Sequence, residues 1–278
     1  MNLTLQGQTA IVTGAGSPTG IGFAFASHLS RQGAFVAIGA TSNRINECAK
    51  LLDPSGERVL PFIADLTDEA RVHQVVEEIT KRTGRIDILV NNAGMAQNGK
   101  QPGNTAVETL SYTEWQQQIA ITLNTAFLMT RAALPIMKKQ KYGRIVNVTS
   151  VTGPLVSNAG SGAYGAAKGA MDGLMRAVAI GHGLDGITIN GVAPGWILTA
   201  SSRPEELAAA KLHPARSPWQ ARRSGRRGRI SSLERSILYN RPNPGSRRRQ
   251  HPSRNEALVA HPSRGDGFPG AGKIAPAP

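Results

Sequence analysis

Six short apolar segments, separated by segments of helical character, constrain the fold of this chain more than any other feature. The apolar segments are 9–12, 34–38, 59–63, 86–90, 144–148 and 187–192. The segments of helical character are 20–32, 43–52, 67–83, 112–140, where Pro135 could introduce a kink, and 161–182. Short apolar runs that end at glycine or polar residues are typical of buried parallel strands. The alternation predicts an α/β fold with a doubly wound parallel sheet, whose third strand lies near an edge because Pro61 lacks a backbone donor.

The pattern stops near residue 212, where the composition changes. Residues 213–278 hold 14 of the 32 lysines and arginines, 3 of the 18 acidic residues and 9 of the 17 prolines. The formal net charge of +14 is therefore mostly a property of this tail. Only seven isoleucine, leucine and valine residues occur there, too few to offset the entropy of ordering. We expect one folded domain over 1–212 and a basic, disordered tail over 213–278.

Composition also limits the class of protein. Cys48 is the only cysteine, which excludes an intrachain disulfide and favours a reducing compartment. We find no leader-like start and no run of about 18 apolar residues, and therefore predict a cytoplasmic protein without a membrane segment. The 13 arginines of the tail could neutralise phosphates, but its aromatic residues are too scattered for base stacking, so nucleic-acid binding is a minor alternative. No metal site is predicted.

A glycine-rich turn follows the first apolar segment. It reads Thr13-Gly14-Ala15-Gly16-Ser17-Pro18-Thr19-Gly20-Ile21-Gly22. A pyrophosphate needs backbone amides that it can approach closely and the positive end of a helix dipole, and glycines permit that approach. The hydroxyls of Ser17 and Thr19 could add donors. The turn predicts a dinucleotide site, with an ordinary glycine-rich turn as the alternative.

The end of the second apolar segment bears on which dinucleotide binds. A carboxylate at this place would accept from the 2′-hydroxyl of NAD and repel a 2′-phosphate. The chain instead has Thr41, Ser42 and Arg44, with no acidic residue until Glu47. Hydroxyls and a guanidinium can bind a phosphate, so NADP(H) is favoured over NAD(H). In the alternative interpretation, Arg44 is a solvated residue of the next helix.

Tyr164 and Lys168 lie four residues apart in a helical segment, so their side chains share one face. Reduction of a ketone needs a proton for the developing alkoxide. A free tyrosine has a pKa of about 10, which a nearby ammonium lowers. The pair therefore predicts a phenolic proton donor.

In this order the motifs resemble those of the short-chain dehydrogenase/reductase family, over about residues 5–200. The resemblance also includes Asn91-Asn92-Ala93-Gly94, Asn124, Ser150 and Pro194-Gly195-Trp196-Ile197. It implies an oxidoreductase that transfers hydride between NADP(H) and a carbonyl or alcohol, nearest to the 3-oxoacyl-acyl-carrier-protein reductases of fatty acid biosynthesis. An alcohol, sugar or steroid dehydrogenase is the alternative.

The resemblance further implies roles for individual residues. Lys168 would hold the nicotinamide ribose, Ser150 would donate to the substrate oxygen, and Asn124 would hold a water in a proton relay. Ser150 and Tyr164 are 14 residues apart, where the family more often has 13, and Thr149 is a second candidate donor. The implied cofactor contacts are Asp65 and Leu66 at the adenine, Asn92, Ala93 and Gly94 beside the adenosine, and Pro194, Gly195, Ile197 and Thr199 at the nicotinamide. Asp65 could equally be a helix cap.

Family members continue with a seventh strand, which pairs with the sixth and commonly builds a homotetramer. We find no such strand and expect a frameshift near residues 211–218. Its loss would leave the sixth strand with unpaired edge groups and uncover apolar surface. The sequence then predicts lower stability, a disturbed oligomer and weak activity, with a cofactor binder without turnover as a further alternative.

Overall fold

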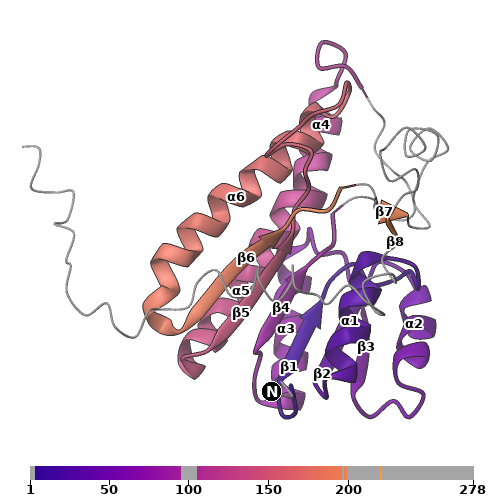
Figure 1. Cartoon of the computed structure of the whole chain (residues 1–278), viewed down its shortest axis with the longest axis vertical. Coiled ribbons are helices and arrows are strands. Elements are labelled where there is room, and N and C mark those ends of the chain that lie inside the picture. The colour runs from indigo at the N-terminus through magenta and orange to yellow at the C-terminus, as the bar shows by residue number, and fades with distance from the viewer. Residues whose placement is uncertain (1–3, 95–104, 196, 199–218, 221–278) are drawn as a thin grey trace, which may run out of the picture. The chain divides into compact units, whose positions relative to one another are not determined.

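The computed structural model describes residues 4–94, 105–195, 197–198 and 219–220. Its main feature is a sheet of six parallel strands in the order β3-β2-β1-β4-β5-β6 (Figure 1). The strands are β1 (Thr9–Val12), β2 (Phe35–Ala40), β3 (Val59–Ile63), β4 (Ile88–Asn91), β5 (Gly143–Val148) and β6 (Ile187–Val192). The predicted doubly wound sheet is confirmed, and so is the edge position of β3, which contains Pro61.

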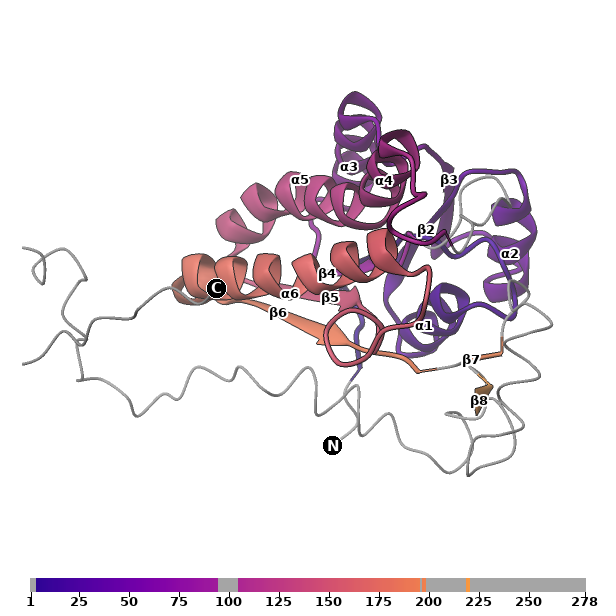
Figure 2. The same ribbon diagram turned by 90° about the horizontal axis from the view of Figure 1, so that it is seen from above.

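The helices are α1 (Ile21–Arg31), α2 (Arg44–Leu52), α3 (Glu69–Thr83), α4 (Tyr112–Ile119), α5 (Thr125–Gln140) and α6 (Gly162–His182). They enclose two hydrophobic cores, because successive side chains of a strand point to opposite faces of the sheet. In β1, Ile11 packs with residues of α3, α5 and α6, whereas Ala10 and Val12 pack with residues of α1 and α2. In Figure 2, α3 and α5 lie above the strands and α1 lies below them. Cys48 belongs to the α1–α2 core, where burial raises the pKa of its thiol.

The predicted helix over 112–140 is interrupted by a π-helical turn, η1 (Ala120–Asn124), between α4 and α5. Pro135 lies inside α5, which continues to Gln140. By length and hydropathy, Tyr112–Gln140 could cross a membrane, although half of its most apolar window is buried inside the protein. A core helix that is largely buried passes the same test of length and hydropathy.

At the other edge, β6 is the last strand of the sheet among the described residues. Beyond it, β7 (Ile197–Leu198) pairs in parallel with β8 (Trp219–Gln220) in a separate two-stranded sheet. The predicted domain boundary at 212, the frameshift near 211–218 and nearly all of the basic tail lie outside the described residues.

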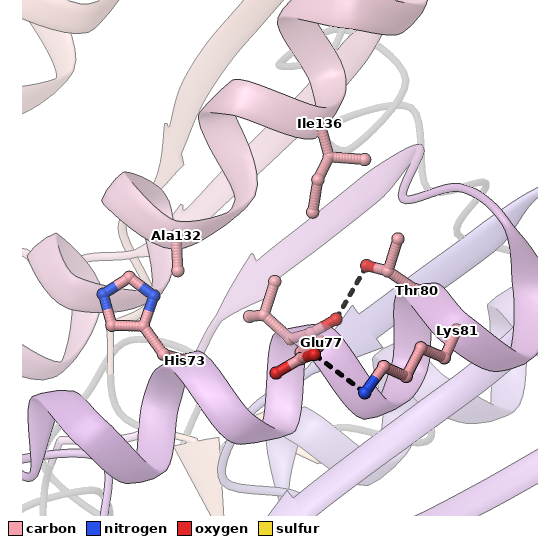
Figure 3. A pocket seen from close by; sticks show the side chains of 7 residues that line it. His73, Glu77, Thr80, Lys81, Ala132 and Ile136 are labelled. Carbon is pink, nitrogen blue, oxygen red and sulfur yellow. Dashed lines mark hydrogen bonds and ion pairs between the residues drawn. The ribbon is translucent and has the colours of Figure 1, made fainter.

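A surface hollow lies between α3 and α5, with a cavity volume of about 380 Å³ (Figure 3). Polar side chains of α3 meet apolar side chains of both helices in it. Glu77 and Lys81 form an ion pair of 2.8 Å across one turn of α3. The hollow is lined by His73, Val76, Glu77, Thr80, Lys81, Ala132 and Ile136, none of which is a predicted site residue.

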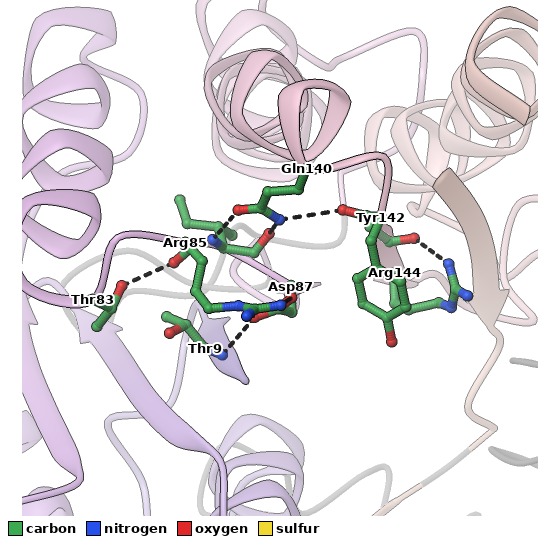
Figure 4. Close-up of polar contacts among 9 residues, drawn as sticks. Thr9, Thr83, Arg85, Asp87, Gln140, Tyr142 and Arg144 are labelled. Carbon is green, nitrogen blue, oxygen red and sulfur yellow. Dashed lines mark hydrogen bonds and ion pairs between the residues drawn. The ribbon is translucent and has the colours of Figure 1, made fainter. Parts of the chain in front are cut away.

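A buried carboxylate joins the amino ends of β1 and β4 (Figure 4). The side chain of Asp87 is fully buried, and it accepts a bond of 2.8 Å from the backbone amide of Thr9. The guanidinium of Arg85 donates to both of its oxygens, at 2.8 and 2.7 Å. The amide of Gln140 bonds to the backbone of Ile86 on both its N–H and its C=O, which fixes the end of α5 to the same place.

Replacing Asp87 with alanine is expected to lower the free energy of unfolding by about 3 kcal/mol, because the buried amide of Thr9 would lose its acceptor and Arg85 its partner. Urea unfolding monitored by circular dichroism measures this loss. Glu57→Ala, at an exposed carboxylate, is the matched control and should change stability by less than about 0.5 kcal/mol. A loss below about 1 kcal/mol for Asp87→Ala would show that the buried carboxylate is not a major anchor.

Candidate active site

The predicted site residues follow the carboxyl ends of the strands. The strand order reverses between β1 and β4, because β2 and β3 lie on one side and β5 and β6 on the other. In doubly wound sheets, ligands bind in the crevice at such a switch point. The glycine turn follows β1, Asn92 follows β4 and Ser150 follows β5, so three distant parts of the sequence meet at one edge.

The glycine turn leaves no room for side chains. A Cβ atom on Gly22 would lie 2.6 Å from the carbonyl oxygen of Gly14, and one on Gly14 would lie 2.8 Å from the side chain of Asn92. Gly14 also has a φ of +69°, which favours glycine. Similarly, a Cβ atom on Gly16 would lie 2.8 Å from that of Ala40 on β2. The turn is thus packed closely against the ends of β2 and β4.

Helix α1 begins directly after this turn. Gly20 is its N-cap residue, and it has no side chain to cap the first amides of the helix. Gly20 donates its amide to the carbonyl of Ser17 at 2.9 Å, which closes the turn before the helix. The hydroxyls of Ser17 and Thr19 lie 3.3 Å apart on its exposed side. Open amides at a helix N-terminus beside bare glycine backbone fit a pyrophosphate.

Thr13 holds the turn in place, a role that the sequence analysis missed. Its hydroxyl accepts from the backbone amides of Asn92 and Ala93, both at 3.0 Å, and donates to the carbonyl of Val90 at 3.3 Å. In return, the side chain of Asn92 donates to the carbonyls of Thr13 and Gly14 at 3.0 and 2.9 Å. The position of Thr13 at the end of a buried strand is the one signal that could have indicated these hydrogen bonds between the glycine turn and the segment after β4.

The adenine-side residues predicted after β2 and β3 are mostly exposed. Thr41 and Arg44 are exposed, and the Nε atom of Arg44 donates to the hydroxyl of Ser42 at 3.4 Å. Asp65 is exposed and accepts from the amide and hydroxyl of Thr67 at 2.9 and 2.7 Å.

The N-cap of α3 is Asp68, whose carboxylate accepts from two backbone amides, so Asp65 does not cap that helix. Leu66 is buried in the hydrophobic core on the side of α3. Its side chain therefore contributes to packing, and only its backbone remains for a ligand.

Tyr164 and Lys168 lie on the same face of α6. The ammonium nitrogen of Lys168 is 5.7 Å from the centroid of the Tyr164 ring. Lys168 is only 4% exposed, and it donates to the carbonyl oxygen of Val148, at the end of β5, at 2.7 Å. Burial lowers the pKa of its ammonium from 10.5 to about 8. Helix α6 thus places the buried ammonium of Lys168 at the carboxyl ends of the strands, beside the phenol of Tyr164.

Ser150 is buried at the same edge. Its oxygen accepts from the amide of Thr152 at 3.0 Å, a bond that leaves the hydroxyl hydrogen to donate elsewhere. The hydroxyl of Thr149 donates to the carbonyl of Val192 at 3.1 Å and so ties β5 to β6. Of the two candidate donors, Ser150 is the one whose hydrogen is not used in this way.

Asn124 ends the π-helical turn η1, and its side chain is exposed. The buried polar residue of that turn is Thr122, whose hydroxyl donates to the carbonyl of Gly94 at 2.6 Å and accepts from the amide of Gln118 at 2.7 Å. The structure thus brings Thr122, and not the side chain of Asn124, against the segment after β4. Sequence reasoning missed Thr122 because nothing in the sequence marks a π-helical turn.

The segment after β6 reaches the same edge. The carbonyl of Pro194 accepts from the amide of Val151 at 3.2 Å, which joins this segment to the loop after β5. Gly195 is exposed, and Ile197 lies in β7. Thr199 lies outside the described residues.

The chain is similar in sequence and in structure to known proteins. A sequence model described as short chain dehydrogenase matches residues 8–209, a range that contains the six-stranded sheet and every predicted site residue. A 3-oxoacyl-[acyl-carrier-protein] reductase of Pseudomonas aeruginosa is 37% identical over 213 residues, 76% of this chain and 83% of that protein. A D-beta-hydroxybutyrate dehydrogenase of Cupriavidus necator is 37% identical over 196 residues, 70% of this chain and 72% of that protein. A solved structure from Burkholderia xenovorans, described as a short-chain dehydrogenase/reductase, has a TM-score of 0.74 at 31% identity and covers 84% of this chain and 90% of its own.

Proposed function

Because the chain belongs to the short-chain dehydrogenase family, we propose that it is an NADP(H)-linked oxidoreductase that reduces a carbonyl to an alcohol, with 3-oxoacyl thioesters as its substrates. The observation that supports this most directly is the buried ammonium of Lys168, 5.7 Å from the ring of Tyr164. The similarity to a 3-oxoacyl-[acyl-carrier-protein] reductase supports the substrate. We further propose that the protein acts in the cytoplasm.

Each residue of the site has a role in this reaction. When bound, the reduced dinucleotide supplies the hydride that forms the new C–H bond at the carbonyl carbon. Tyr164 donates a proton to the carbonyl oxygen, and Ser150 orients that oxygen by a hydrogen bond. The positive charge of Lys168 favours the phenolate that remains. The glycine turn and the open N-terminus of α1 hold the pyrophosphate.

The proposed assay is oxidation of NADPH in the presence of short 3-oxoacyl thioesters, with a fluorescence titration of the cofactor in parallel. Loss of NADPH absorbance that depends on the thioester supports the function. Cofactor binding without turnover on any carbonyl would instead identify an inactive binder. Activity on a hydroxy acid alone would favour the second candidate, a dehydrogenase acting on an alcohol, which the similarity to the hydroxybutyrate enzyme supports.

The preference for NADP(H) rests on Arg44 and Ser42, whose side chains bond to each other at the end of β2. Arg44→Ala is expected to raise the dissociation constant of NADPH by about 10- to 100-fold, the value of a charge-assisted hydrogen bond. The constant for NADH should stay unchanged, because NADH lacks the 2′-phosphate. Lys50→Ala, an exposed cation on the same helix, is the matched control. Equal constants for NADPH and NADH in the unaltered protein would contradict the preference.

We also propose that the chain diverges from its family beyond the matched range, which ends at residue 209, and that its homo-oligomer is disturbed in consequence. Translation of the gene in the other two frames would test the divergence. A helix followed by an apolar strand and glycines in one of those frames is the expected result. A stable, active tetramer in size-exclusion chromatography would contradict the disturbed assembly.

A further inference from the structure

The segment 92–94, which follows β4, forms hydrogen bonds on two sides. On one side, the hydroxyl of Thr13 and the side chain of Asn92 join it to the glycine turn. On the other side, the hydroxyl of Thr122 donates to the carbonyl oxygen of Gly94 at 2.6 Å. The bonds to the glycine turn shape the proposed dinucleotide site directly, whereas the proposed function gives no role to the bond from Thr122.

Thr122 lies in the π-helical turn η1, and its side chain is fully buried. Its hydroxyl accepts from the side-chain amide of Gln118 at 2.7 Å, so the hydroxyl has a donor partner as well as an acceptor partner. Gln118 is itself only 4% exposed. A hydroxyl with both partners is held in one orientation, and its removal would leave a buried carbonyl and a buried amide without their bonds. The contact with Gly94 is therefore fixed and desolvated.

The backbone of η1 also packs directly on Gly94. Gly94 has a φ of +137°, and a Cβ atom there would lie 2.9 Å from the carbonyl oxygen of Ile121 and 2.9 Å from the Cα atom of Thr122. Only glycine allows so close an approach of two backbones. The turn η1 also contacts α6, the helix that carries Tyr164 and Lys168. The π-helical turn thus contacts both the helix of the candidate catalytic residues and the segment after β4.

We infer that Thr122 is a positioning residue for the dinucleotide, on which it acts through Gly94 and not by contact. The inference rests on the proposed function, since that function places the dinucleotide at the glycine turn. The Thr122 hydroxyl fixes the Gly94 end of the segment 92–94. The same segment bonds to Thr13 and Gly14, so a shift of its Gly94 end changes the turn that is proposed to hold the pyrophosphate.

The replacement Thr122→Val tests this role, because valine keeps the shape of the side chain and removes the hydroxyl. The dissociation constant of NADPH should rise about tenfold, the effect of a hydrogen bond worth about 1.4 kcal/mol. Thr122→Ser keeps the hydroxyl and should bind NADPH within about twofold of the unaltered protein. A fluorescence titration measures the three constants.

Thr125→Val is the matched control. Thr125 is also buried and follows η1 directly, but its hydroxyl donates to the carbonyl of Ile121 at 3.0 Å, within the same helical region. Its loss removes the same chemical group without touching the segment after β4. The affinity for NADPH should therefore stay the same in Thr125→Val. Equal weakening in the two valine variants overturns the inference, because the hydroxyl of Thr122 would then act only on the stability of the helix.

Hydrogen exchange of the protein without cofactor gives a second measurement. The amides of Asn92 and Ala93 bond to Thr13, and they should exchange about tenfold faster in Thr122→Val than in Thr125→Val. Faster exchange throughout the sheet, with no larger change at these two amides, overturns the positioning role, because only global stability would then have fallen.

The outcomes separate the positioning role from the proposed function. If the unaltered protein binds NADPH and Thr122→Val binds it equally tightly, the function stands and the role of Thr122 is wrong. If the unaltered protein has no affinity for NADPH, both the proposed function and the inference are wrong.

Discussion

Replacing Tyr164 with phenylalanine is expected to lower turnover by about three orders of magnitude, the contribution of a well-placed general acid. The phenyl ring keeps the packing of α6 and removes only the hydroxyl that we propose as the proton donor. The proposed cofactor contacts lie in the glycine turn and at Lys168, so the dissociation constant of NADPH should stay within about twofold of its value for the unaltered protein. Steady-state NADPH oxidation and a fluorescence titration measure the two quantities.

Tyr142→Phe is the matched control, because Tyr142 precedes the amino end of β5, whereas the candidate site lies at the carboxyl ends of the strands. The ring of Tyr142 stacks with the guanidinium of Arg144. It should leave turnover unchanged. Full activity of Tyr164→Phe would remove the phenol from the mechanism. A large loss of cofactor affinity in the same variant would show that the residue binds the dinucleotide rather than the reacting oxygen.

Lys168→Met is expected to abolish turnover and to change how stability depends on pH. Methionine keeps the length of the side chain but removes the charge that favours the phenolate, and with it the donor to the carbonyl of Val148. The stability effect follows from the pKa of the buried ammonium, which is about 8 in the folded protein against 10.5 for a free lysine. Between these two values, the unfolded chain binds more protons than the folded protein.

Stability therefore rises with pH in this window, since unfolding takes up a proton there. Compared with Lys168→Met, the free energy of unfolding of the unaltered protein should increase by up to about 1.4 kcal/mol per pH unit above pH 8. Below about pH 8 both states hold the proton, and the difference should be constant. Urea unfolding from pH 7 to 10 measures it, with Lys139→Met at an exposed lysine as control. A difference that stays flat across this range would mean that Lys168 is not desolvated.

Much of the fold could be predicted because local pattern and tertiary position agree. The strands over 59–63 and 187–192 have the predicted bounds, because both segments are rich in the β-branched and aromatic residues that favour strands. The division of the helix over 112–140 could not be predicted. Within the π-helical turn, the hydroxyl of Thr122 bonds to the carbonyl of Gly94, a contact between positions 28 residues apart that a local pattern does not indicate.

The candidate site shows the same division between local and distant effects. The spacing of Tyr164 and Lys168 fixes their common face of α6, because the geometry of a helix is local. The exposure of Asn124 and the hydrogen bonds of Thr13 depend on which elements pack nearby, and residue type alone does not determine that. The bond from the amide of Gly20 to the carbonyl of Ser17 closes the glycine turn, and the loop between Ser150 and Tyr164 contains the turn at Gly153.

The hydrogen bonds between Thr13 and the segment after β4 have a consequence for folding during synthesis, which proceeds from the N-terminus. The glycine turn leaves the ribosome early, but the amides that bond to the Thr13 hydroxyl belong to residues 79 and 80 positions later. A nascent chain that ends before Asn92 has the complete glycine motif without the groups that shape it. We therefore expect the chain to become able to bind the dinucleotide during translation only after β4 has emerged and paired with β1.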